Sequence, residues 1–404
     1  METNKYFLLA GILLLAAIAG ISYWLSAEFT DVFVAQENFF QSGNLKPVIV
    51  KEVKNKSMVP VPPSNADLIL TSVDMLNAAK DDAELRQILL KFGPKNTMAD
   101  LLADSGGGTL IDCHQEAHNI GRIAYEIFGS SAFKDGNSSC HSGYYHGAIE
   151  AFLQENGTAN LVGNIKIICN SFQTSFGRFE CLHGIGHGVL AYENYDLPEA
   201  IKICAALATN YDQSSCYGGM FMENITTAQG WGAGGVHETS WVDKANPYFP
   251  CDGIGDDYSV RYQCYQMQTS WMLTIFNYNF DLVKDACLKA PADMRLVCFK
   301  SFGRDAAGHT LRDADKITAI CAKLTENNDY YNECVNGALN VIVDFWGDGL
   351  ENQATEFCKK IPEKGKLNCY QTLNWRLADV FGNADHELTI CNGFEEEYRR
   401  LCAD

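Results

Sequence analysis

Six of the nine histidines lie in three short segments of the first half of the chain, CHQEAH (113–118), CHSGYYHG (140–147) and CLHGIGHG (181–188). Two of these segments carry histidines four residues apart, which share one face of a helix about 5–6 Å apart. Paired imidazoles on a helix face are a common way to bind a transition metal. The segments predict a metal site for metal handling or metal-assisted chemistry, with the ligands His114, His118, His141, His146, His183 and His187.

Nearby side chains bear on the identity of the metal. Met220 and Met222 follow the third segment, and thioethers beside imidazoles favour copper. A carboxylate beside the imidazoles suits zinc or non-heme iron instead, and Glu116, Glu150 and Glu223 are the candidate ligands and proton carriers for catalysis. In the alternative interpretation, the histidines bind no metal and only pack and form hydrogen bonds between helices.

Glycines mark the same region. A glycine inside a helix costs about 0.5–1 kcal/mol relative to alanine, so several together need a compensating close approach of helices or of a ligand. They are Gly143, Gly147, Gly184, Gly186, Gly188, Gly218 and Gly219.

Other sequence signals are weaker. His237 and Glu238 lie where a lid over the site is conceivable, and the isolated His309 and His386 are interpreted as structural or surface residues. The chain lacks HExxH, GxSxG, P-loop and dinucleotide-binding motifs, so standard hydrolases, kinases and dehydrogenases have no sequence support. Whether the protein is an enzyme stays open.

Sixteen cysteines recur in pairs. From Cys169 onward the partners are 11 to 13 residues apart, and the second member of each pair returns about every 35 residues, which indicates a repeat array. An even count and regular pairing favour disulfides over free thiols or cysteine-metal sites. The expected disulfide cysteines are Cys113, Cys140, Cys169, Cys181, Cys204, Cys216, Cys251, Cys264, Cys287, Cys298, Cys321, Cys334, Cys358, Cys369, Cys391 and Cys402.

The sequence around each pair predicts a short helix, a polar turn and a longer helix. The first cysteine lies near the end of the short helix and the second near the start of the long one. Asp196, Asp281 and Asp313 stand at plausible N-cap positions. Over residues 160–404 this pattern resembles the disulfide-stapled Sel1-like and tetratricopeptide-type repeat proteins. The resemblance implies an all-α fold, an α-solenoid of helix-turn-helix repeats with about one disulfide each, used for binding.

The N-terminal region predicts a different environment. Residues 6–26 include an uncharged run long enough to cross a bilayer, after a five-residue cytoplasmic stub. The run is interpreted as a retained single-pass anchor, with a cleaved signal peptide as the alternative. Both place the rest outside the cytoplasm: a stalk at 27–63, a helical cap at 64–109 and the repeat array at 110–404, with an insertion at 227–262.

Composition limits the partners. Acidic residues outnumber basic ones by 50 to 31, for a net charge of −19. So acidic a chain repels phosphate backbones and argues against nucleic-acid binding. Sequons at Asn55, Asn137, Asn156 and Asn224 predict glycosylation. The alternative function is a non-enzymatic scaffold whose concave face binds a peptide, glycan or envelope protein through aromatic residues, namely Tyr144, Tyr145, Tyr217, Trp271 and Trp375.

Overall fold

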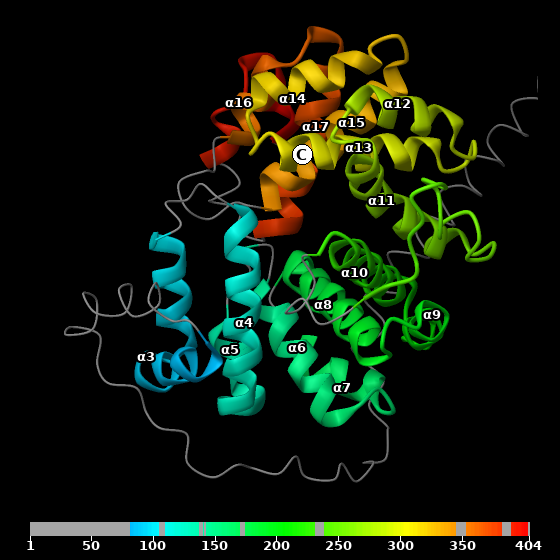
Figure 1. Ribbon diagram of the computed structural model, residues 1–404. Coiled ribbons are helices and arrows are strands. Elements are labelled where there is room, and N and C mark those ends of the chain that lie inside the picture. Colours follow the sequence, from blue (N-terminus) through cyan, green and yellow to red (C-terminus); the bar gives the residue numbers. More distant parts are fainter. Residues whose placement is uncertain are drawn as a thin grey trace, which may run out of the picture. The chain divides into compact units, whose positions relative to one another are not determined.

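The computed structural model describes most of the chain beyond residue 80, within one compact unit, Met58–Asp404. The described ranges are 81–104, 110–136, 140, 143–169, 174–230, 238–344, 353–381 and 389–402. They form helices and turns with no strand in any of these ranges, which confirms the all-α prediction (Figure 1). The predicted anchor and stalk lie outside the described residues. Within the ranges above, no helix has both the length and the apolar character needed to cross a bilayer.

After a first helix α3 (Asp82–Asp104), which is kinked at Gly93, long and short helices alternate along the described chain, except that α11 follows α10 directly. The long helices are α4 (Leu110–Phe128), α6 (Gly143–Asn156), α8 (Ser175–Tyr192), α10 (Asn210–Ala228), α11 (Tyr258–Ile275), α13 (Arg295–His309), α15 (Asn328–Asp344) and α17 (Glu363–Phe381). The short helices are α5 (Ala132–Asp135), α7 (Leu161–Ile168), α9 (Leu197–Ala205), α12 (Phe280–Lys289), α14 (Ala314–Cys321) and α16 (Gln353–Lys360). Short 3-10 helices lie at Gly129–Ser131, Ala322–Leu324 and Glu396–Cys402.

Each long helix packs against the next long helix in chain order, from α4 to α17. An open solenoid has such neighbour contacts alone. Here α17 also packs against α8, where Ser175 donates a hydrogen bond to the backbone oxygen of Asp379. The side chain of Arg376 lies over the ring of Phe176 at the same contact. Helices about 200 residues apart in sequence are therefore in contact.

The chain reverses direction in the same way after α8, α11 and α13. Two successive residues adopt left-handed backbone angles, and the amide of the second donates to the carbonyl five residues earlier, as from Tyr195 to Leu190. The next residue then caps the following short helix. Asp196 and Asp313 are N-caps as predicted, but Asn279 caps α12, so the prediction for Asp281 is wrong. Asp281 lies in the first turn, where its amide donates to the Asn279 side chain.

All sixteen cysteines form disulfides between consecutive members of the series. Typical pairs such as Cys204–Cys216 and Cys287–Cys298 join the end of a short helix to the first half of the long helix that follows. Each bridge closes a loop of 11 to 13 residues, except for Cys113–Cys140, whose partners are 27 residues apart. The bridges therefore fasten local hairpins and leave the contacts between hairpins to side-chain packing.

In three pairs of long helices the two backbones are in direct contact, and each helix has a glycine at the point of contact. A Cβ atom added to Gly186 would lie 2.0 Å from the carbonyl oxygen of Cys216, and one added to Gly219 would lie 1.7 Å from that of His183. The α4–α6 pair does the same with Gly121 and Gly147, and the α13–α15 pair with Gly303 and Gly337. Only glycine permits this separation, so the predicted close approach is present and extends to α13 and α15.

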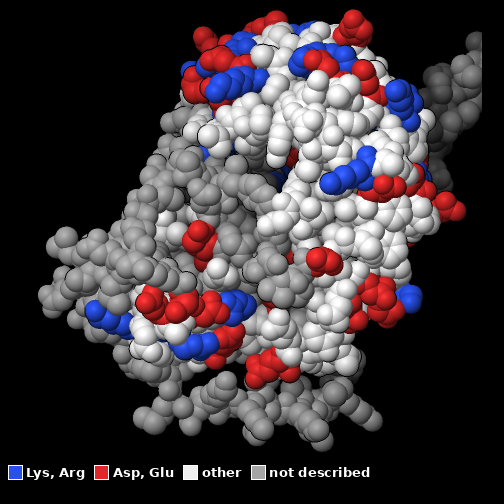
Figure 2. All heavy atoms as spheres, in the orientation of Figure 1, with Lys and Arg blue, Asp and Glu red and all other residues white. Residues whose placement is uncertain are grey.

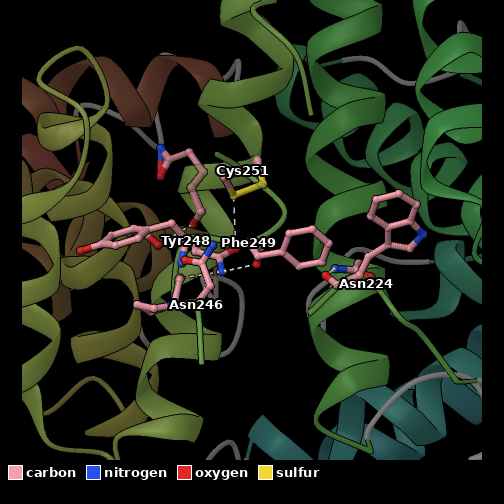
Figure 3. Close-up of a disulfide and its surroundings, with 11 residues drawn as sticks. Asn224, Asn246, Tyr248, Phe249 and Cys251 are labelled. Carbon is pink, nitrogen blue, oxygen red and sulfur yellow. Dashed lines mark hydrogen bonds between the residues drawn. A yellow bond between two sulfur atoms is a disulfide. The ribbon is translucent and has the colours of Figure 1, made fainter. Parts of the chain in front are cut away.

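The predicted insertion at 227–262 is shorter in the structure, because α10 continues to Ala228 and α11 starts at Tyr258. Its described part packs on the helices. The Gln268 side chain donates to the carbonyl oxygens of Pro247 and Phe249, and the Cys251–Cys264 disulfide anchors the segment on α11 (Figure 3). Cys251 lies in a turn, and residues 238–250 before it form turns and bends, so this described stretch has no short first helix of the kind that the repeat pattern predicts.

Two surface predictions are corrected by burial. Asn224 is fully buried, donates to the Trp241 carbonyl and accepts from Thr239, so its amide is not accessible for a glycan in this fold (Figure 3). Among the five aromatic residues proposed for a concave binding face, Trp375 is 75 % exposed and the others are core residues, namely Tyr144, Tyr145, Tyr217 and Trp271.

Many charged side chains lie at the surface, and several pair across neighbouring helices. Acidic and basic residues are intermixed on the face drawn in Figure 2. Lys360 on α16, for example, lies 2.6 Å from Asp315 on α14. Exposed pairs of this kind contribute at most about 1 kcal/mol each, so the stability of the fold rests on its core and its disulfides.

Candidate metal site

Three buried histidines converge between α6 and α8. His146 lies on α6, and His183 and His187 lie one turn apart on α8. Their side chains each offer a ring nitrogen, and the three nitrogens lie within 4.8 Å of one another. The three residues are between 1 % and 5 % exposed. This arrangement can hold a metal ion once the rings move closer and turn toward one point, because metal–nitrogen bonds of about 2.0–2.1 Å place two ligand nitrogens at most about 4.2 Å apart.

The rings lie in an ordered stack. His146 and His187 are nearly parallel, with ring centroids 4.3 Å apart, and His183 tilts against them at 5.6 Å and 5.0 Å. His146 and His187 each follow the second cysteine of their hairpin by six residues. Because α6 packs against α8, equivalent positions on the two helices meet.

Glycines make room for the rings. A Cβ atom on Gly184 would lie 3.2 Å from His146 Cδ2, and one on Gly218 would lie 3.2 Å from His183 Nδ1. Both separations are tighter than most real Cβ contacts. The same Cβ positions would also lie 2.7 Å from Ile149 Cδ1 and 3.1 Å from Gln263 Oε1, so glycine here leaves room for these side chains as well as for the imidazoles. Gly186 and Gly219 instead set the distance between the helix backbones.

Glu223 on α10 orients His187. Its Oε2 lies 2.9 Å from His187 Nδ1, and Tyr195 donates to its Oε1 at 2.6 Å. Burial raises the pKa of Glu223, but the hydrogen bonds from His187 and Tyr195 outweigh it and lower that pKa to about 2. An ionised carboxylate accepts from Nδ1–H, which leaves the lone pair on Nε2. In the described part of the structure, this buried Nε2 has no hydrogen-bond partner. A carboxylate behind a ligating histidine is the usual support of a metal site.

A second acidic group lies beside the cluster. Glu150 follows His146 by one turn of α6, and its Oε2 lies 3.5 Å from Nε2 of the buried His118 on α4. Burial and the nearby charge of Glu223 raise the pKa of Glu150 to about 7, against the opposing charge of Arg122. A carboxyl group with such a pKa can accept or release a proton near neutral pH.

The six predicted histidine ligands separate into groups. His146, His183 and His187 come together, and His118 instead contacts Glu150. His114 lies on α4 with its side chain outside the described atoms, and His141 and His237 lie outside the described residues, as does His386. Among the predicted acidic residues, Glu116 is exposed, Glu223 supports His187 and Glu150 lies beside His118.

Two residues that contact Glu223 were not among the predicted site residues. Tyr195 lies in the left-handed turn after α8, and Thr227 lies on α10, where its hydroxyl is 3.1 Å from Glu223 Oε1. Tyr195 reaches Glu223 through the packing of separate segments, which no spacing along the chain indicates, whereas Thr227 lies four residues after Glu223 on the same helix, a spacing that the sequence shows. His309 is exposed and stacks on Tyr278, in agreement with a surface role.

No known protein family, characterised protein or solved structure matches this chain. The fold and site themselves define the class: an all-helical, disulfide-rich protein with a buried cluster of three histidines that can hold a metal ion.

Proposed function

We propose that this protein binds one transition-metal ion through His146, His183 and His187, for metal handling or metal-assisted chemistry. The observation that carries the proposal is the convergence of three buried ring nitrogens within 4.8 Å, with His187 oriented by Glu223. Imidazoles that only fill space do not need an ionised buried carboxylate behind them, because burying that charge is costly.

The proposal extends to the setting of the site. We propose a repeat solenoid, closed by the contact between α8 and α17, behind an N-terminal anchor or signal at 6–26 and outside the cytoplasm. Eight disulfides support this location, since disulfides persist in oxidising compartments. The alternative of a scaffold that binds a peptide or glycan has less support, because four of its five aromatic residues are in the core.

Metal analysis of the purified protein tests the proposed function. The wild-type protein is expected to carry or take up one equivalent of copper, zinc or iron. The double variant His146→Ala with His187→Ala is expected to lose it, with its circular dichroism unchanged. His309→Ala, which removes an exposed histidine, is the matched control and is expected to keep the metal. A wild-type protein that cannot be loaded with any of these metals contradicts the proposal.

A further inference from the structure

A sulfur atom lies next to the histidine cluster. The thioether Sδ of Met222, on α10, is 3.5 Å from Nε2 of His183 on α8. In a tetrahedral zinc site with a nitrogen ligand at about 2.0 Å and a thiolate sulfur at about 2.3 Å, the two ligand atoms are separated by about 3.5 Å, and this serves as the reference for a nitrogen and a sulfur on one ion. The two side chains therefore already have the spacing of ligands that share one metal ion.

The other donors narrow the choice of metal. No thiolate is available, because every cysteine is in a disulfide. Glu223 accepts hydrogen bonds from His187 and Tyr195, and Glu150 lies beside His118. The remaining donors are uncharged imidazole nitrogens and one thioether. Magnesium, calcium and manganese prefer oxygen ligands, whereas a thioether beside imidazoles suits copper, above all copper(I).

We infer that the site binds copper(I), with the Met222 thioether as a ligand beside His146, His183 and His187. The inference rests on the proposed function and adds to it the identity of the metal and one ligand.

Copper(I) competition with a chromophoric chelator, under anaerobic and reducing conditions that leave the disulfides intact, tests this inference on the full-length protein. Met222→Leu keeps the volume of the side chain and removes the sulfur. Met272→Leu, at a fully buried methionine of α11, is the matched control. We expect Met222→Leu to weaken copper(I) binding at least tenfold and to change zinc(II) binding less than twofold. Met272→Leu should leave both affinities unchanged.

The outcomes separate the two proposals. If Met222→Leu binds copper(I) as tightly as wild type, while His187→Ala does not bind it, the ligand assignment is wrong and the three-histidine metal site stands. If the wild-type protein prefers zinc(II) to copper(I), the inferred metal is wrong. If the wild-type protein binds neither ion, the proposed function fails as well. Thermal melts of each variant without metal show whether it is folded. If Met222→Leu is not folded, Met222→Ile takes its place in the competition assay.

Discussion

Gly219→Ala is expected to damage the metal site from a distance by forcing α8 and α10 apart. The added Cβ would lie 1.7 Å from the carbonyl oxygen of His183, whereas real Cβ contacts essentially never fall below 3.0 Å. The two backbones must therefore separate locally by at least about 1.3 Å, the difference between these values. Overpacking of a tight contact costs typically 1–3 kcal/mol. Because the added Cβ meets backbone atoms of His183 and no movable side chain, we expect a loss of about 3 kcal/mol for this variant.

The same displacement reaches the ligands. Glu223 lies four residues after Gly219 on α10, and its carboxylate is 2.9 Å from His187 Nδ1. Moving α10 away by more than 1 Å takes this contact beyond hydrogen-bond distance. Losing the group that orients a ligating histidine typically weakens metal binding 10- to 100-fold. We therefore expect Gly219→Ala to lower both the free energy of unfolding and the metal affinity.

Gly303→Ala provides the matched control. Its Cβ would lie 1.9 Å from the carbonyl oxygen of Cys334, an equivalent clash in the α13–α15 pair, which carries none of the three histidines. Urea denaturation with the disulfides intact should show a comparable loss of stability in both variants, and chelator competition should show weaker metal binding in Gly219→Ala alone. Wild-type metal affinity in Gly219→Ala, or an equal loss of affinity in both variants, would refute the coupling between helix separation and the site.

Three further changes have defined outcomes. Glu223→Gln removes the carboxylate behind His187 and should weaken metal binding 10- to 100-fold in the competition assay. Glu150 has a pKa raised to about 7 by burial, so its ionisation costs the folded protein about 3 kcal/mol, a penalty absent below its ordinary pKa of 4.5 and complete above 7. Glu150→Gln should therefore raise the Tm, measured with chelator present, at about pH 8 and not at about pH 4. Replacing Cys287 and Cys298 by alanine opens a loop of 11 residues and should lower the free energy of unfolding by about 3 kcal/mol in urea titrations.

The parts of the fold that depend on local sequence could be predicted. Helical periodicity, the N-caps Asp196 and Asp313 and the pairing of nearby cysteines act over fewer than fifteen residues, and the structure has all three. The contact between α8 and α17 could not be predicted, because no periodic signal links residues about 200 positions apart. Asn279 was missed as a cap because Asp281, two residues later, is also a good capping residue.

The site was only partly predictable for the same reason. The equivalent positions of His146 and His187 in consecutive hairpins indicated that they would meet, and they do. Spacing alone cannot show that His118 contacts Glu150, because that depends on how α4 crosses α6. The role of Glu223 was also beyond the sequence, since it requires His187, Tyr195 and α10 to meet at one point.

The glycine contacts allow the two interpretations of the histidines to be compared within one molecule. In the α8–α10 pair the contact glycines follow their cysteines by five and three residues, and the glycines of the α13–α15 pair do the same. Backbone contact between long helices is therefore a property of the hairpin pattern and does not require a metal site.

The α8–α10 pair differs from the α13–α15 pair in the side chains at equivalent positions. At the positions of His183 and His187, the α13 helix has Lys300 and Arg304, and at the position of Gly184 it has Ser301. Ser301 instead joins a hydrogen-bonded network with α11, so tight packing is compatible with quite different side chains. If close helix contact alone explained the histidines, α13 would have little reason to differ. In the α8–α10 region, the imidazoles converge with the glycines that make room for them and with the carboxylate of Glu223. This convergence is the expected pattern for residues that share a ligand.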